Sequence, residues 1–347
     1  MTLASPIRRS ITTSARHVVL FLTLTVSSLA VAQAVPTIGA GAGGGSKVPY
    51  RGTSVSYGHS ITPYNYTKEV VSWTHRMGLM PEWHFTDAFT VRARFYLTQE
   101  FTLSDTTNSV NEVELSDLWL DAVWGGWKEK NTGIRLGADL RSTFPTSKQS
   151  RAVTRLFTLA PGLNVSRTFG VLSGLTFVYS ARFTWRFNRF STRQNEGGLI
   201  SNCNANAEQV QAVGFIDACN NTSSGANNVQ ADVLHGPTVV FNPHERVNIS
   251  ASLFMQRGWV SPMSAYEELG VSLPARNYTR DFIGFSIGLS YQPWDVVGFT
   301  LGAFTFANQL DTTGQYIFPL FNRNTAASLD ATFDLEAIVS SIAKEQK

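Results

Sequence analysis

The chain of 347 residues is 43% hydrophobic and only 15% charged. Typical soluble domains carry roughly 25% charged residues, so this balance excludes a disordered acidic or basic protein. The formal net charge of +3 comes from Arg8, Arg9 and Arg16, because the chain after residue 34 holds equal numbers of basic and acidic side chains. No basic surface is left to attract a nucleic-acid backbone, and we expect no nucleic-acid partner.

The first 34 residues have the pattern of a secretory signal peptide. The basic region ends at Arg16, an apolar stretch runs from Val18 to Ala30, and small residues for cleavage follow at Ala32-Gln33-Ala34. A membrane anchor needs about 20 apolar residues, and hydroxyl side chains interrupt this stretch, so the pattern favours cleavage after residue 34 over an anchor. The glycine-rich residues 35–50 are expected to form a periplasmic linker.

Beyond the signal peptide, apolar and polar residues alternate with a period of two. Between Leu175 and Asn188 every odd position is apolar or aromatic, and the even positions include two arginines and three hydroxyl residues. This alternation is typical of a β-strand with one apolar and one polar face. At about 3.3 Å per residue and a tilt of about 40°, such a strand spans roughly 30 Å, the thickness of the hydrocarbon layer. No later apolar run is long enough for a membrane helix, so a membrane protein with this sequence is a closed β-barrel.

The alternation recurs in twelve segments. We expect strands at residues 51–60, 66–84, 87–103, 112–125, 132–144, 153–168, 174–191, 231–242, 246–259, 279–292, 295–309 and 326–339. Their connections alternate between short turns and long segments. Short turns on one rim and long loops on the other are expected of an outer-membrane barrel with both chain ends in the periplasm.

Alternation alone does not exclude a soluble β-sandwich, in which the apolar face points inward. The strand lengths and the aromatic content favour the membrane interpretation, in which aromatic side chains gather at both membrane interfaces. We expect one belt beside the short turns, at Trp83, Trp124, Trp127, Phe169 and Trp294, and one toward the long loops, at Trp73, Phe101, Phe190, Trp259 and Tyr278.

This layout resembles bacterial outer-membrane β-barrels of the porin and transporter type. The resemblance is architectural and covers residues 51–340, which leaves 341–347 as a C-terminal tail. It implies an all-β fold, namely an antiparallel transmembrane β-barrel of about 12 strands with short periplasmic turns and long extracellular loops. It also implies a location in the bacterial outer membrane, with outer-membrane lipid and the barrel-assembly machinery as partners. Barrels of this type commonly end on an aromatic residue, whereas here a tail follows Phe333 and Leu335.

The polar positions of the alternating strands carry arginines and carboxylates. An arginine facing lipid at mid-membrane costs about 2–4 kcal/mol, so these residues are assigned to the lumen. The residues expected to line the narrow part of a pore are Arg92, Arg94, Arg141, Arg182, Arg186, Asp117, Asp121 and Asp139. A β-bulge near Asp117 keeps the apolar residues of the fourth strand on the lipid side. Hairpin pairing then predicts Asp121 near Arg92 and Arg94, and Asp117 near Arg141.

The tenth and eleventh strands place small residues inward, among them Gly284, Gly288, Gly298 and Gly302. We therefore expect an uncrowded wall opposite the arginines, along which small polar solutes pass by diffusion. A porin-like channel is the leading functional hypothesis. The main alternative is a plugged barrel that acts as a surface binding or structural protein.

A second alternative is a lipid hydrolase like the outer-membrane phospholipases, which use a serine and a histidine on the outer wall. The nearest candidate is His59-Ser60, but Ile61 and Thr62 stand where the phospholipase motif has asparagine and glycine. His75 is assigned to the lipid side, without an evident acid or serine partner. We expect no enzyme and no cofactor.

The two cysteines of the chain, Cys203 and Cys219, lie in one asparagine-rich segment. In an exported protein they are expected to form a disulfide. A closed loop of about 15 residues contributes on the order of 3 kcal/mol in the chain-entropy model. Two cysteines without a nearby histidine do not supply a zinc site, so no metal is expected.

Overall fold

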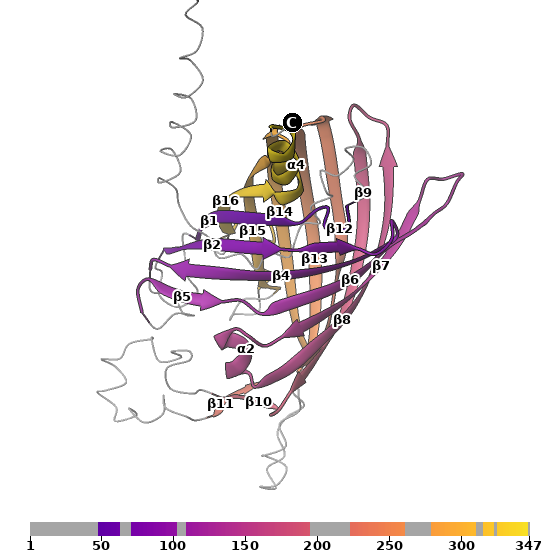
Figure 1. The fold of residues 1–347 in the computed structure, drawn as a ribbon. Coiled ribbons are helices and arrows are strands. Elements are labelled where there is room, and N and C mark those ends of the chain that lie inside the picture. Colours follow the sequence, from indigo (N-terminus) through magenta and orange to yellow (C-terminus); the bar gives the residue numbers. More distant parts are fainter. Residues whose placement is uncertain are drawn as a thin grey trace, which may run out of the picture.

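The computed structural model describes residues 48–62, 71–102, 109–194, 223–260, 279–309, 315–322 and 325–345. The predicted signal peptide, most of the linker, and both cysteines lie outside the described residues. Almost all of what is described is antiparallel strand, arranged as a barrel (Figure 1). No helix in these ranges is both long and apolar enough to span a membrane.

The elements follow one another along the chain with short connections at one end of the barrel. The strands are β1 (Ser54–Thr62), β2 (Ser72–Met80), β3 (Glu82–His84), β4 (Phe89–Glu100), β5 (Glu112–Leu115), β6 (Leu118–Lys128), β7 (Arg135–Phe144), β8 (Arg155–Phe169), β9 (Leu175–Asn188), β10 (Thr192–Gln194), β11 (Ser223–Asn227), β12 (Val229–His244), β13 (Val247–Val260), β14 (Thr279–Trp294), β15 (Val297–Asn308) and β16 (Thr325–Asp334). The helices of the described residues are α2 (Lys148–Ala152) and α4 (Leu335–Glu345).

The sheet closes on itself. Each strand pairs with its sequence neighbour in the barrel, and β1 pairs antiparallel with both β2 and β16. The sheet has 14 strands, but β2 with β3, and β5 with β6, each form one span across the barrel. Twelve spans result, which confirms the predicted strand number and the all-β antiparallel fold. The short strands β10 and β11 pair only with each other.

The two interrupted spans have different causes. Between β2 and β3 stands Pro81, which has no N–H to donate to the ladder, and its carbonyl oxygen still accepts from Ala93 N at 2.9 Å. Between β5 and β6 the register against β4 shifts by one residue, from the pair Leu97–Leu115 to the pair Arg94–Trp119. This shift is the bulge expected near Asp117, and the prediction is confirmed.

The apolar side chains face outward, and the alternate positions are buried. Leu163, Leu301 and Trp185 are 59%, 58% and 53% exposed, whereas Asp121 and Asp232 are 1% and 2% exposed. A soluble sandwich has the opposite distribution, so the sandwich alternative is wrong. The predicted belts are exposed on this outer face at Trp83, Trp124, Trp127, Phe169, Trp294, Trp73, Phe190 and Trp259. Phe101 packs against Trp73 with ring centroids 5.0 Å apart, and Tyr278 lies outside the described residues.

The short turn between β6 and β7 is stabilised by residues close together in the sequence. Gly126 has φ +87°, and an added Cβ would collide with the carbonyl oxygen of Leu136. In the turn itself the Thr132 hydroxyl donates to Glu129 Oε2 at 2.6 Å, and Asn131 N donates to Oε1 at 2.9 Å. These hydrogen bonds, that of Thr132 first, lower the pKa of Glu129.

The C-terminal end differs from the prediction of a strand over 326–339. Strand β16 ends at Asp334, and α4 follows directly, so the predicted boundary at residue 340 falls inside a helix. Asp334 Oδ1 accepts from Ala337 N at 3.0 Å, which is the geometry of an N-cap. Leu335, Ile338 and Ile342 have helical spacing. Figure 1 shows α4, in yellow, at the end of the barrel beside β16 and β1.

Candidate functional site

The candidate site is the inner face of β4 to β9, which we call the arginine wall. It consists of the positions that alternate with exposed apolar residues, and its arginines are Arg92, Arg94, Arg141, Arg155, Arg182 and Arg186. Because neighbouring strands bring these positions side by side, the guanidinium groups form a layer across five consecutive spans.

Asp121 of β6 lies at the centre of this wall and is 1% exposed. Arg141 donates to it through Nε at 2.7 Å and Nη2 at 3.3 Å, and Arg92 Nε lies 3.5 Å from its Oδ2. Arg92 also lies 3.6 Å from Glu82. The predicted neighbourhood of Asp121 and Arg92 is confirmed, and one carboxylate serves two guanidinium groups.

Arg94 is the unusual member of the wall. It is 5% exposed and lies within range of charge interactions with Asp121, Arg92 and Arg141, of which the neighbourhood of Asp121 was expected from the hairpin pairing. In the described part of the chain no carboxylate forms a direct ion pair with it, and its Nε has no hydrogen-bond partner. A buried guanidinium without a direct ion pair is energetically costly.

The pair Asp139–Arg182 forms across an intervening strand. Arg182 Nη2 of β9 donates to Asp139 Oδ2 of β7 at 2.6 Å, and Gly162 of β8 stands between them in the register. A Cβ at Gly162 would come 2.6 Å from Asp139 Oδ1, so the absence of a side chain there makes the contact possible.

Arg186 forms an ion pair with Asp232, which is 2% exposed. Asp232 was not among the expected pore residues. Its inward direction could have been predicted from the sequence, because Asp232 alternates with the outward positions Ala231 and Val233 in the predicted strand that starts at residue 231.

The prediction of Asp117 beside Arg141 is wrong. Both Arg141 contacts go to Asp121, and Asp117 Oδ1 accepts from Ser147 N at 2.9 Å. Its Oδ2 accepts from the Ser150 hydroxyl. The chain after β7 turns back toward the bulge, which brings Ser147 and Ser150 to Asp117 in place of Arg141.

Helix α2 lies against inner-face residues at the long-loop end of the barrel. Lys148 is 8% exposed, and its Nζ lies 2.6 Å from Glu112 Oε1 and 2.6 Å from Glu114 Oε1. Gln149 Nε2 donates to Glu114 Oε2 at 2.8 Å, and Arg155 Nη1 donates to the Ser150 hydroxyl at 3.2 Å. The sequence predicted only a long connection here, because a five-residue helix has no periodic pattern to detect.

The wall opposite the arginines is only partly as expected. At Gly284 the space is not open, because an added Cβ would collide with the Phe254 ring. Phe254, Phe282 and Phe306 form a stack, with centroids 6.0 Å apart for Phe254–Phe306 and 5.0 Å for Phe282–Phe306. At Gly298 the nearest atom to an added Cβ is a backbone oxygen 4.0 Å away, so this end of the wall stays uncrowded. The three phenylalanines alternate with the outward residues of their strands, so their inward direction could have been predicted from the sequence.

The histidines considered for hydrolase chemistry lie on the outer face. His59 and His75 are paired in register with ring centroids 5.9 Å apart, and His75 packs against Phe101 at 5.0 Å. Ser60 and Thr74 belong to the opposite face of the same strands. Among the described residues, no group of three or more metal-ligating side chains is present.

No protein-family model matches the sequence, and a search of curated proteins finds no match to it. Solved structures do resemble the fold. The COG4313 outer membrane channel from Pseudomonas putida F1 aligns with a TM-score of 0.50 and 13% identity, over 84% of this chain and 98% of that chain. The KdgM porin aligns with a TM-score of 0.42 and 8% identity, over 81% of this chain and 99% of that chain. The NanC porin aligns with a TM-score of 0.42 and 11% identity, over 82% of this chain and 100% of that chain.

The likeness to the Pseudomonas channel confirms the outer-membrane barrel fold. The surface of the molecule agrees with it, because a closed barrel with an apolar exterior and buried charges requires lipid on its outside and water or polar groups within. The protein is therefore a β-barrel of the bacterial outer membrane.

Proposed function

We propose that the barrel is a channel through which small polar solutes cross the outer membrane, with a preference for anions. The single observation that supports this most is Arg94, a buried guanidinium on the inner face without a carboxylate partner among the described residues. The ion pairs around it hold the neighbouring guanidinium groups in fixed positions.

The proposed selectivity comes from charge and width. A solute carboxylate or phosphate that enters the lumen would meet at Arg94 a guanidinium without a direct ion pair among the described residues. Beside it Arg92 and Arg141 share Asp121, and Glu82 lies 3.6 Å from Arg92. Rings of charged side chains of one sign favour passage of the opposite sign. Residues Arg182, Arg186 and Asp139 extend the same layer toward β9 and complete the proposed pore lining together with Asp121.

The plugged barrel remains the second candidate, and two observations favour it. Helix α2 is held against the inner face by Lys148, and the Phe254 stack fills one wall. In that case the loops and the outer surface carry the function, and no solute passes.

Planar-bilayer recordings of the purified full chain test the channel. The wild type is expected to conduct with a preference for anions. Arg94→Gln is expected to shift the reversal potential in a salt gradient in the direction of lower anion selectivity, because the substitution removes a positive charge and leaves no carboxylate unpaired. Arg167→Gln is the matched control, since Arg167 is exposed on the outer face, where its guanidinium lies 4.7 Å from the Phe169 ring centroid. A folded wild type that never conducts contradicts the channel and supports the plugged barrel.

A further inference from the structure

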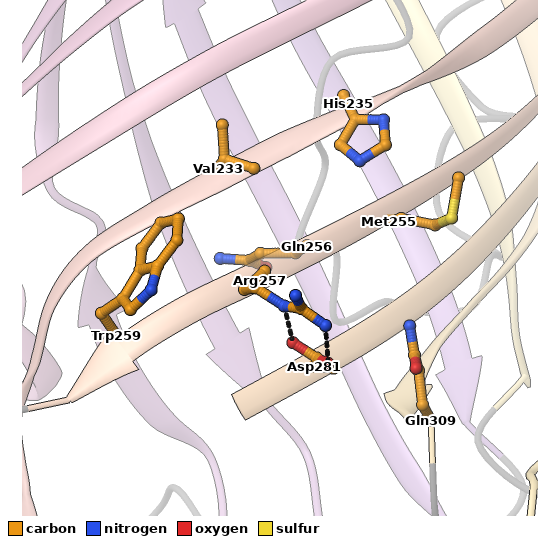
Figure 2. A pocket seen from close by; sticks show the side chains of 8 residues that line it. All are labelled: Val233, His235, Met255, Gln256, Arg257, Trp259, Asp281 and Gln309. Atoms are coloured by element: carbon orange, nitrogen blue, oxygen red, sulfur yellow. Dashed lines mark hydrogen bonds and ion pairs between the residues drawn. The ribbon is translucent and has the colours of Figure 1, made fainter. Parts of the chain in front are cut away.

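A groove of about 400 Å³ lies on β12 to β14, close to the long-loop rim. It is lined by Val233, Met255, Arg257, Trp259, Asp281 and Gln309 among others. Figure 2 shows Arg257 in its middle, with Asp281 on one side and Met255 and Trp259 to either end. None of these residues belongs to the arginine wall.

The register places the groove on the outer wall of the barrel. Arg257 pairs with Asp281 and with Val233, so the three share one face. The same face carries Ile287 and Leu289, which are 39% and 46% exposed. The groove therefore faces lipid rather than the lumen.

The depth of the groove follows from the outward residues of β13 and β14. From Val247 to Met255 every outward position of β13 is apolar, and the next one is Arg257. On β14, Asp281 lies ten positions before Tyr291, which is outward near the short turns. With about 3.3 Å per residue and a tilt of about 40°, this distance corresponds to about 25 Å, the height of the apolar band of such barrels. Arg257 thus lies at the extracellular edge of the band, beside the belt residue Trp259.

The ion pair leaves part of Arg257 available. Nε donates to Asp281 Oδ1 at 2.8 Å and Nη2 donates to Oδ2 at 2.7 Å, while the Arg257 side chain is 59% exposed. A guanidinium has five N–H donors, so three remain, including both on Nη1. In the described ranges no acceptor bonds to Nη1. Asp281 acts as a positioning residue that fixes the plane of the guanidinium.

We propose that this groove binds a phosphate-bearing lipid of the outer leaflet. Arg257 would hold the phosphate through its free N–H groups, since guanidinium geometry suits phosphate oxygens. Met255 and Val233 provide apolar surface for the first part of an acyl chain, and Trp259 lies at the interface, where an amphipathic ring is favoured. A lipid is the occupant that fits, because the groove combines one free cationic edge with apolar walls at the depth of the headgroups.

Native mass spectrometry of the full chain in detergent tests the proposal, with bisphosphorylated lipid A as the probe. The double variant Arg257→Gln with Asp281→Asn removes both charges and leaves no carboxylate unpaired. It is expected to bind the probe about tenfold more weakly, the effect of losing a charge-assisted contact. Arg167→Gln, an outward arginine at the short-turn end, is expected to bind like the wild type. Heat-dependent gel mobility verifies that each variant is folded.

Three results would overturn the proposal. One is equal affinity of the wild type and the double variant for the probe. Another is that the wild type binds lipid A without phosphates as tightly as bisphosphorylated lipid A, because Arg257 would then not recognise a phosphate. The third is a dimer of the chain that the double variant abolishes, because the groove would then belong to a second copy.

Discussion

At the residue scale, the inner face is notable for the way in which charges are buried. Asp121 is tolerated because Arg141 satisfies both of its oxygens and Arg92 approaches from the neighbouring strand. Such a carboxylate contributes little net stability compared with an apolar residue, but the removal of its charge takes away the acid that Arg141 contacts and leaves Arg92 with Glu82 alone.

Asp121→Asn is therefore expected to lower the free energy of unfolding by on the order of 3 kcal/mol, because Arg141 loses its counter-charge and Arg92 keeps only Glu82. Denaturant unfolding of the barrel in detergent, followed by tryptophan fluorescence, measures this. The control is Asp87→Asn, which removes the exposed partner of Arg51 and should change stability by less than about 1 kcal/mol. Equal effects of the two substitutions would mean that the interior is hydrated enough to screen Asp121.

At the scale of elements, α2 and α4 are small helices added to an otherwise regular barrel, and each is fixed by polar contacts at its start. For α2 these are Ser147 and Asp117 at the N-terminus and Lys148 between Glu112 and Glu114. Because a five-residue helix has little stability of its own, its position depends on these side chains.

Lys148→Met is expected to release α2. Without the ammonium group the two carboxylates repel each other, and the helix loses its buried anchor. Hydrogen exchange of the amides of residues 148–153 should accelerate about tenfold or more, the effect of losing roughly 1.4 kcal/mol of local stability. If the barrel conducts, its conductance should also rise.

Arg151→Met is the matched control for this experiment, because Arg151 lies on the same helix but is exposed. Its exchange rates should stay close to those of the wild type. Unchanged exchange in both variants would show that backbone contacts, rather than Lys148, hold α2 in place.

At the scale of the whole molecule, closure of the sheet decides the direction of every side chain. Pairing of β1 with β16 leaves no free edge, and the outward apolar residues form one continuous band. This band is stable only against lipid, since about 25 cal/mol per Å² of apolar surface would otherwise oppose its exposure to water.

A charge introduced into the band tests this arrangement. Leu163→Arg is expected to destabilise the folded barrel in lipid by about 2–4 kcal/mol, the cost of an arginine near mid-membrane. Reversible unfolding in lipid vesicles measures the effect. The control is Leu172→Arg in the turn after β8, where the leucine is 72% exposed beyond the band and the change should be small. A similar small effect at both positions would contradict the membrane depth assigned to β8.

The strand pattern and the direction of the side chains were determined by the sequence alone, because alternation is a local property of extended backbone. The twelve spans, the bulge before Leu118, and the outward position of Trp124 all followed from parity. The end of β16 did not, since Ala331, Phe333 and Leu335 fit a strand while Leu335, Ile338 and Ile342 fit a helix. Only the Asp334 cap and the contact of Leu335 N with Thr53 O decided between them.

Partners within the candidate site were decided by the tertiary structure. Arg186 and Asp232 are 46 residues apart, and Asp139 meets Arg182 only because Gly162 leaves a gap between their strands. The same holds for Asp117, which accepts hydrogen bonds from Ser147 and Ser150 rather than from Arg141. It also holds for Phe254, whose ring fills the space at Gly284. Parity states which face a side chain occupies, whereas register, closure and the volume of neighbouring side chains determine what it touches there.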